Sequence, residues 1–230
     1  MTKCESSKKY FMPILLVGCG IFFILSAKAV FAEEIDGLIK NLHSKDERIQ
    51  LSAVDALGRF KENEAIEALL DFVFIKAENW RVKIRAILLL GDIPDPRVSD
   101  RLVTIFNNPF LNEECPAMKW HTAIALGKDF NKGTRAVDSL IEALDYDNLL
   151  VREGVIQSLG EIGDSRAVPF LLPALRDRSF AIRFSTIRAL ERINDPRVIP
   201  YLREAADKDN DAQIKEAALS ALRKFKMDSF

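Results

Sequence analysis

Apolar residues recur along residues 33–230 in a pattern whose period is about 33 positions. Each period contains a short motif made of a small or apolar residue, a Leu and then an anchor residue. The six anchors are Gly58, Gly91, Gly127, Gly160, Glu191 and Arg223, at spacings of 33, 36, 33, 31 and 32 residues. A fixed period of this length is the sequence signature of stacked structural repeats.

Each anchor stands near the end of a predicted amphipathic helix. Four positions before the anchors stand Val54, Ile87, Ala123, Ile156, Ile187 and Leu219. Nine positions before the anchors stand Ile49, Val82, Met118, Val151, Ile182 and Ile214. Together with the Leu before each anchor, these positions trace one buried stripe at helical spacing.

Another predicted helix precedes this one in each period, so each unit has a first helix and a second helix. The first helix has apolar residues at i, i+3, i+4 and i+7, as in Ile66, Leu69, Leu70 and Val73. Neither helix can bury its stripe alone, so neighbouring units must stack. The sequence therefore predicts an all-α fold, an α-solenoid of about six two-helix repeats. The predicted units are 33–63, 64–95, 96–133, 134–164, 165–195 and 196–230.

Polar residues at the predicted helix starts keep the same register. Residues that commonly cap helix N-termini stand twelve positions before five anchors: Asp46, Asn79, Asn148, Ser179 and Asp211. Three units begin with Asp-Pro-Arg or Asp-Ser-Arg, at Asp95, Asp164 and Asp195. Both features predict where one helix stops and the next begins.

The segment from Leu159 to Pro169, which reads LGEIGDSRAVP, closely resembles the HEAT-like repeats first described in phycobilin lyase subunits. The resemblance covers about residues 33–230. It implies a HEAT solenoid whose second helices line a concave face. It implies less about function, because the same repeat occurs in lyase subunits, hydroxylases, DNA-repair enzymes and adaptors, and a fold does not dictate a function.

The first 32 residues have the layout of a secretory signal peptide. Lys3, Lys8 and Lys9 precede an uncharged run at 10–27, and small residues at 29–32 provide a cleavage site before Glu33. Two alternatives stay open. The segment before Cys19 fits a lipobox, which would make Cys19 a lipid anchor, and the uncharged run is just long enough to remain as a membrane anchor. All three readings predict a periplasmic or cell-envelope location, with membrane contact only through this segment.

Composition describes a globular chain with 48% hydrophobic and 29% charged residues. Residues 33–230 keep 29 basic and 33 acidic side chains, a formal charge of −4. A nucleic-acid binder needs a clustered positive field, so we expect no nucleic-acid partner. Cys115 is the single cysteine after residue 32, so packing and not an internal disulfide must stabilise the domain.

The sequence lacks the common motifs of catalysis and metal binding, including the P-loop, Gly-x-Ser-x-Gly, His-Glu-x-x-His and Cys-x-x-Cys. Its histidines are His43 and His121, and neither is followed by Glu as in the iron-binding His-Glu pairs of hydroxylases with similar repeats. We therefore expect no enzyme activity, no metal and no cofactor. The alternative is a phycobilin-lyase-like or other enzyme-associated subunit.

Basic residues also recur, eight positions before five anchors, at Lys83, Lys119, Arg152, Arg183 and Lys215. One interpretation is an anion-binding strip. The other, which we favour, is a structural ladder. Acidic residues lie six positions before three members, at Glu113, Asp177 and Asp209, an arrangement that resembles the Asp-Arg ladder of HEAT turns.

The predicted binding surface lies where large apolar residues occupy second-helix positions that the register leaves free. In units two and three these residues are Ile84, Leu88, Trp120 and Ile124, bordered by Arg85 and His121 and extended by Phe184 and Arg188. An exposed apolar patch of this kind marks an interaction site. Alternatively, the long connection 107–116 covers the patch with Phe110 and Leu111. The sequence thus predicts a non-enzymatic scaffold or adaptor of the bacterial cell envelope that binds a protein partner through its concave face.

The signal-peptide interpretation makes a direct prediction about the mature chain. The intact mass of the protein purified from its native envelope should correspond to a chain that begins at Glu33. A diacylglyceryl group on Cys19, or a mass that includes residues 1–32, would contradict cleavage at this site.

Overall fold

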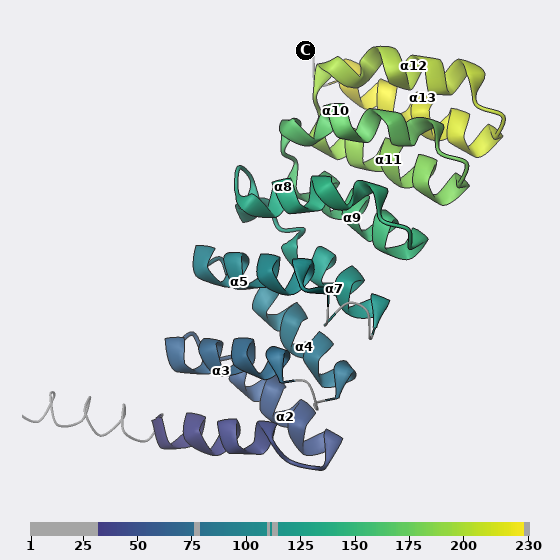
Figure 1. The fold of residues 1–230 in the computed structure, drawn as a ribbon. Coiled ribbons are helices and arrows are strands. Elements are labelled where there is room, and N and C mark those ends of the chain that lie inside the picture. The colour runs from purple at the N-terminus through teal and green to yellow at the C-terminus, as the bar shows by residue number, and fades with distance from the viewer. Residues whose placement is uncertain (1–31, 76–78, 110, 112–114, 228–230) are drawn as a thin grey trace, which may run out of the picture.

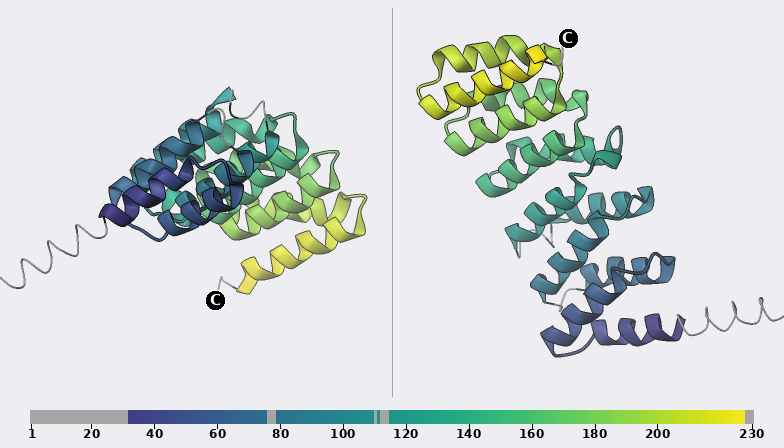
Figure 2. Two further views of the ribbon diagram at one scale, coloured as in Figure 1. Left: turned by 90° about the horizontal axis from the view of Figure 1, so that it is seen from below. Right: turned by 180° about the vertical axis from the view of Figure 1, so that it is seen from behind.

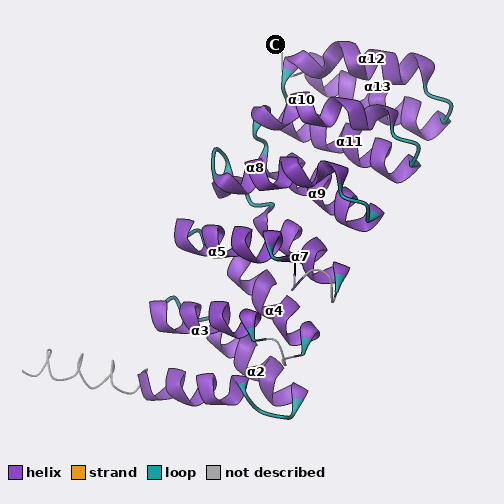
Figure 3. Cartoon of the chain, in the orientation of Figure 1, coloured by secondary structure: helices purple, strands orange, loops and turns teal. Residues whose placement is uncertain are grey.

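A computed structural model describes residues 32–75, 79–109, 111 and 115–227. Throughout these residues the regular elements are helices, and they pair into six units stacked one on the next (Figures 1 and 3). This confirms the predicted all-α solenoid. Within the described ranges, no helix has the length and apolar character needed to cross a membrane. The predicted leader at 1–32 lies outside these ranges except for Ala32.

The helices form two layers, one made of first helices and one of second helices (Figures 1 and 2). The first-helix layer contains 32–42, α3 (Asn63–Phe74), α5 (Pro96–Asn107), α8 (Arg135–Glu142), α10 (Val168–Leu171) and α12 (Ile199–Lys208). The second-helix layer contains α2 (Glu47–Leu57), α4 (Trp80–Gly91), α7 (Pro116–Leu126), α9 (Leu149–Ile162), α11 (Phe180–Ile193) and α13 (Ala212–Met227). Short 3₁₀ turns extend several first helices: η2 (Ala143–Asp145), η3 (Ser165–Ala167), η4 (Leu172–Arg176) and η5 (Pro196–Val198). A further 3₁₀ turn, η1 (Asp129–Asn131), lies in the connection between α7 and α8.

The anchor glycines allow successive second helices to approach closely. A Cβ atom at Gly91 would lie 2.7 Å from Ala125 Cβ, and one at Gly160 would lie 2.6 Å from Ala189 Cα. At Gly127 a Cβ atom would lie 3.0 Å from Ser158 Cα, whereas at Gly58 it would meet only the Leu89 side chain. A side chain at Gly91, Gly127 or Gly160 would therefore force neighbouring helices apart. This contact explains Gly at three of the six anchors.

Successive second helices approach each other along more of their length than successive first helices do. On the first-helix side a groove of about 840 Å³ opens between units five and six, lined there by Pro169, Pro173, Tyr201 and Ala205. The second helices therefore form the more tightly stacked side of the solenoid, and we call this side the inner face.

Two residues of the predicted buried stripe are exposed, which corrects the prediction at both ends. Ile49 is 44% exposed and Leu219 is 41% exposed, although equivalent residues such as Val151 and Ile187 are fully buried. The position nine before the anchor faces the preceding unit, and the position four before it faces the following unit. In the described chain, the first and last units lack these neighbours.

Four of the five predicted N-caps form. Asp46, Asn79, Asn148 and Asp211 each accept a hydrogen bond from a backbone N–H two residues later. Ser179 does not cap its helix through its side chain. Its N–H instead donates to Asp177 Oδ1 at 2.7 Å, because that carboxylate folds back over the turn.

The basic ladder joins units, as the structural interpretation predicted. Arg152 pairs with Asp177 of the next unit at 3.1 Å, and Arg183 pairs with Asp209 at 2.8 Å. Lys119 and Lys215 donate to backbone carbonyls at the ends of their own first helices, Phe106 and Asp207. The two arginine pairs therefore tie successive units together, whereas Lys119 and Lys215 bind within their own units.

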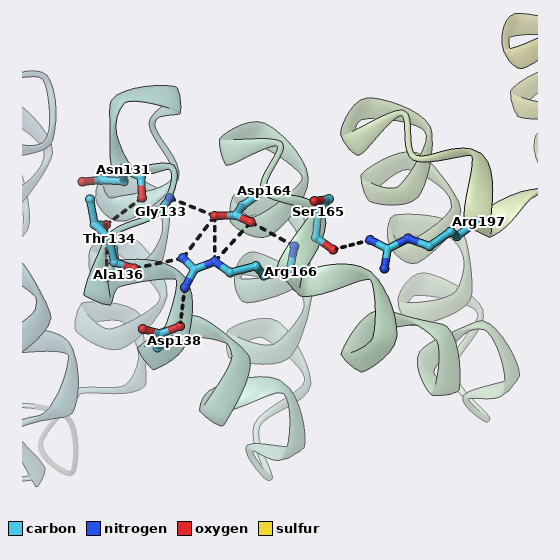
Figure 4. Close-up of polar contacts among 9 residues, drawn as sticks. All are labelled: Asn131, Gly133, Thr134, Ala136, Asp138, Asp164, Ser165, Arg166 and Arg197. Carbon is cyan, nitrogen blue, oxygen red and sulfur yellow. Dashed lines mark hydrogen bonds and ion pairs between the residues drawn. The ribbon is translucent and has the colours of Figure 1, made fainter.

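The Asp-x-Arg motifs form another set of inter-unit bonds, which Figure 4 shows at Asp164. Asp164 caps its own turn, binds the Arg166 guanidinium and accepts a 2.8 Å hydrogen bond from Gly133 N–H of the preceding unit. Arg166, at the start of unit five, also reaches Asp138 of unit four at 3.1 Å. In the next unit, Arg197 repeats this backward reach to a backbone carbonyl (Figure 4). One motif therefore starts a helix and ties it to the preceding unit.

This network sets the protonation of Asp164. Burial alone raises the pKa of its carboxyl group, but the hydrogen bonds from Arg166 and from Gly133 N–H outweigh burial and hold the pKa below its ordinary value. A carboxyl group with a lowered pKa stabilises the fold above its unfolded-state pKa, about 3.9, and loses that contribution as pH falls through the folded-state pKa.

We therefore predict that Asp164→Asn lowers the free energy of unfolding by about 1 to 2 kcal/mol at pH 7, because it weakens hydrogen bonds to a charged group. The deficit should begin to shrink below about pH 4, where the carboxyl group of the unfolded chain is protonated, and should be lost as pH falls through the lower folded-state pKa. Urea denaturation across pH measures both values. Asp36→Asn, on an exposed part of the first helix, is the control and should have little effect. An equal deficit at pH 7 and pH 3 would contradict this account.

Candidate binding surface

The structure places the predicted patch on the inner face but does not leave it free. Ile84 is 7% exposed and belongs to the core, which contradicts its prediction as a free position. Leu88 and Ile124 are partly buried, and Leu88 packs against the core. The patch in units two and three is therefore mainly packing surface.

The contacts of Trp120 show why a position that was predicted to be free of packing is in fact packed. Its indole lies against Gly154 of the next unit, so that a Cβ atom there would lie 2.4 Å from Trp120 Cδ1. The missing side chain of Gly154 makes the space that the ring fills. Trp120 stands seven positions before its anchor, and we call the residues at this repeat position the seven-back column. They were predicted to be free of packing, but in unit three Trp120 joins α7 to α9. Trp120 is thus a packing residue that stays partly exposed.

His121 borders Trp120, as predicted. The two rings meet edge to face, with centroids 4.5 Å apart and an interplanar angle of 80°. The Nδ1 atom of His121 lies 2.7 Å from the Ala117 carbonyl oxygen, so this nitrogen carries the proton. In the neutral ring, Nε2 is then an acceptor. His121 therefore packs beside Trp120 and keeps one polar atom available.

The remaining predicted residues lie apart from this pair. Arg85 is exposed, and its guanidinium pairs with Asp55 of unit one at 2.6 Å. Arg188 pairs with Glu191 on its own helix at 3.0 Å. Phe184 is partly buried and stacks on Phe180, with ring centroids 5.8 Å apart. The apolar residues of the predicted site therefore fall into two groups. One is packed in units two and three, and the other is Phe184 in unit five.

The connection 107–116 was the predicted alternative cover. Leu111 is 8% exposed and belongs to the core. Phe110 lies outside the described residues, so its predicted role remains a prediction. Cys115, near the end of this connection, is partly buried and carries a free thiol.

Lys119 is a buried cation at the junction of units three and four. Its ammonium donates to the Phe106 carbonyl oxygen at 2.9 Å and lies 4.3 Å from the Phe106 ring and 4.8 Å from the Tyr146 ring. Burial lowers the pKa of Lys119. The two aromatic faces compensate part of its lost hydration. Because it is enclosed, Lys119 is a structural residue and not part of an anion-binding strip.

Sequence reasoning missed exposed apolar residues at the start of the second helices, eleven positions before the anchors. Trp80 is 47% exposed, Leu149 41% and Phe180 38%, and Pro116 is exposed at the same place in unit three. We call these four residues the turn-side row. They follow the turn between the two helices of each unit and lie one helical turn before the seven-back column. The sequence did contain a signal for this row. An apolar residue that directly follows an N-cap lies outside the predicted buried stripe, so it can be expected to be exposed.

Further accessible atoms lie at the other end of the inner face. A hollow of about 480 Å³ between the C-terminal ends of α7 and α9 is lined by Ile124, Lys128, Gln157 and Glu161, with Gly127 and Ser158 at its base. Lys128 pairs with Asp92 at 2.6 Å, and Glu161 pairs with Arg192 at 3.0 Å. Across the described ranges, no group of three or more His, Cys, Asp or Glu side chains is placed to hold a metal ion.

Comparisons with known proteins agree with the repeat architecture. The chain is similar to a designed armadillo repeat protein in complex with the peptide (KR)4. The alignment covers 84% of this chain and 99% of that chain, with 14% sequence identity and a TM-score of 0.54. It is also similar to the complex of CpcE and CpcF of phycocyanin lyase from Nostoc sp. PCC7120. That alignment covers 81% of this chain and 75% of that chain, with 21% sequence identity and a TM-score of 0.53. At these identities the likeness shows the fold alone. No curated protein matches the sequence significantly.

The family assignment rests on the repeats themselves. A family model for HEAT repeats matches residues 35–110, 109–179 and 139–223, which together span most of the chain. The same residues carry the anchor glycines, the N-caps and the inter-unit ladders described above. The chain therefore belongs to the HEAT-repeat family.

Proposed function

We propose that this protein is a scaffold or adaptor of the cell envelope that binds a protein partner along the inner face of its second helices. The observation that carries the proposal is the turn-side row, defined above as Trp80, Pro116, Leu149 and Phe180. Its members occupy the same repeat position in four consecutive units and are all exposed. Large apolar side chains aligned on a soluble surface favour binding of another macromolecule.

The shape of the row indicates the kind of partner. Successive repeats place equivalent residues at regular intervals, so the row is long and narrow. Such a surface suits an extended or helical protein segment better than a compact small molecule, for which a concave pocket is usual. The designed armadillo protein of similar fold holds a peptide, which supports the physical feasibility of this mode on a helical solenoid.

The envelope location rests on the sequence of residues 1–32, which resembles a secretory signal, with lipidation or membrane anchoring as its alternatives. The similarity to the lyase complex extends to the fold, and the described site gives no observation that favours a chromophore. We therefore propose a binding role and place no reaction at this surface.

Site-specific photo-crosslinking in the native envelope tests the proposal. A photoreactive residue replaces Gln157, which is exposed on the second-helix face of α9. The matched control replaces Thr104, which is exposed on the first helix α5. We expect a discrete protein adduct from position 157 and none from position 104. An adduct from position 104 alone, or equal adducts from both, would contradict binding on the inner face.

A further inference from the structure

Among the described residues, the most exposed large apolar side chain lies on the second helix of unit four. Leu150 is 64% exposed, beside Leu149 at 41%, and both lie in the first turn of α9. In the next unit Phe180 occupies the position equivalent to Leu149 and stacks on Phe184. A soluble helix normally has polar side chains in such an exposed first turn, so this end of the surface has apolar side chains available for binding.

A hydrogen bond shows that the two helix ends lie side by side. Ser185 Oγ on α11 donates to Glu153 Oε1 on α9 at 3.1 Å. One helical turn earlier on each helix stand Ala181 and Leu149. Because adjacent turns of paired helices remain adjacent, Leu149 and Phe180 belong to one continuous patch.

Acidic side chains outnumber basic ones in unit four, which carries Leu149 and Leu150, whereas the exposed Arg178 stands two residues before Phe180 in unit five. Residues 134–164 contain seven acidic and two basic side chains, although the whole chain has a net charge of −1. Asp138, Glu161 and Asp164 are paired with arginines. Within the part of the chain that the structure describes, the salt bridges leave four carboxylates of this unit without a cation: Glu142, Asp145, Asp147 and Glu153.

Two of these carboxylates lie directly beside the apolar residues. Asp145 and Asp147 flank Tyr146 in the turn that leads into α9, and all three residues are exposed. Lys119 does not fill this negative region with an accessible charge, because it is buried beneath the Tyr146 ring. The turn therefore combines negative charge with an apolar surface.

We propose that this acidic-apolar patch, made of Asp145, Tyr146, Asp147, Leu149, Leu150 and Phe180, binds a protein segment in which Lys or Arg residues alternate with bulky apolar residues. The cations contact Asp145 and Asp147, and the apolar side chains cover Leu149, Leu150 and Phe180. Opposite charges steer the encounter, and burial of the apolar side chains supplies most of the affinity. The inference rests on the proposed function and specifies the partner's chemistry for the same surface.

Peptides of defined composition test this chemistry directly. The probe is a fluorescent twelve-residue peptide, Lys-Leu-Ser repeated four times, titrated into protein purified after expression of the whole chain. The comparison peptides replace every Leu by Ser, or every Lys by Glu. We expect the Lys-Leu-Ser peptide to bind at least about tenfold more tightly than either comparison peptide, since each of them lacks one of the two contacts. Its affinity should also fall as salt concentration rises.

Variants locate the binding to the patch. Leu150→Ser should weaken the Lys-Leu-Ser peptide by about tenfold, and Asp145→Asn combined with Asp147→Asn should weaken it and reduce its salt dependence. Phe170→Ser removes an apolar side chain of unit five that is 55% exposed but lies on first helix α10. Asp207→Asn removes an exposed carboxylate of unit six. These two controls should leave affinity unchanged, and circular dichroism should show that all variants remain folded.

Several outcomes would overturn the inference. They are equal binding of the three peptides, no binding of the Lys-Leu-Ser peptide, or unchanged affinity in Leu150→Ser. Binding to phosphatidylcholine vesicles containing phosphatidylserine, lost in Leu150→Ser, would assign the patch to a lipid surface instead. None of these results removes an adduct formed at position 157, so failure here is distinguishable from failure of the proposed function.

Discussion

The close approach of successive second helices at the anchor glycines is the constraint on which the rest of the structure depends. Gly91 and Gly160 bring backbones together where any side chain would collide with the next unit. This contact draws one layer together and makes the second helices the more tightly stacked side of the solenoid. The last junction departs from the pattern, because Glu191 replaces Gly and pairs with Arg188 and Lys224 at 3.0 and 3.9 Å.

Much of the architecture was predictable because each feature depends on local sequence. The 33-residue period, the helix spacing and four of five N-caps could be read from residues close together in the chain. The exposed ends could not, because burial of Ile49 and Leu219 requires a neighbouring unit. A stripe shared by all repeats gives no information on which repeats lie at the ends.

The proposed binding surface was harder to predict, because the exposure of each of its residues depends on two units at once. Trp120 was expected to project freely, but the absence of a side chain at Gly154 creates a space into which its ring packs. Conversely, Leu149 and Phe180 lie outside the buried stripe from which the fold was predicted, so the prediction did not include them, although they begin adjacent helices. Exposed and packed side chains occupy neighbouring positions of the same helix. A difference of one residue in the next unit, such as Gly154, decides whether a side chain packs or stays exposed. The charged ladders act on both, because Arg152 and Arg183 hold the helix starts in register and so hold the exposed apolar residues in a row.

The effect of a single methyl group on unfolding tests the central claim most directly. Ala is the better helix former by about 1 kcal/mol, so Gly→Ala within a helix should stabilise wherever space allows. At Gly37, where an added Cβ meets nothing within 4 Å, we expect this gain in the free energy of unfolding. At Gly160, where the Cβ would lie 2.6 Å from Ala189 Cα, we expect instead a loss of about 1 to 3 kcal/mol. Equal stabilisation by Gly37→Ala and Gly160→Ala in urea denaturation would contradict the claim that close helix approach holds this solenoid together.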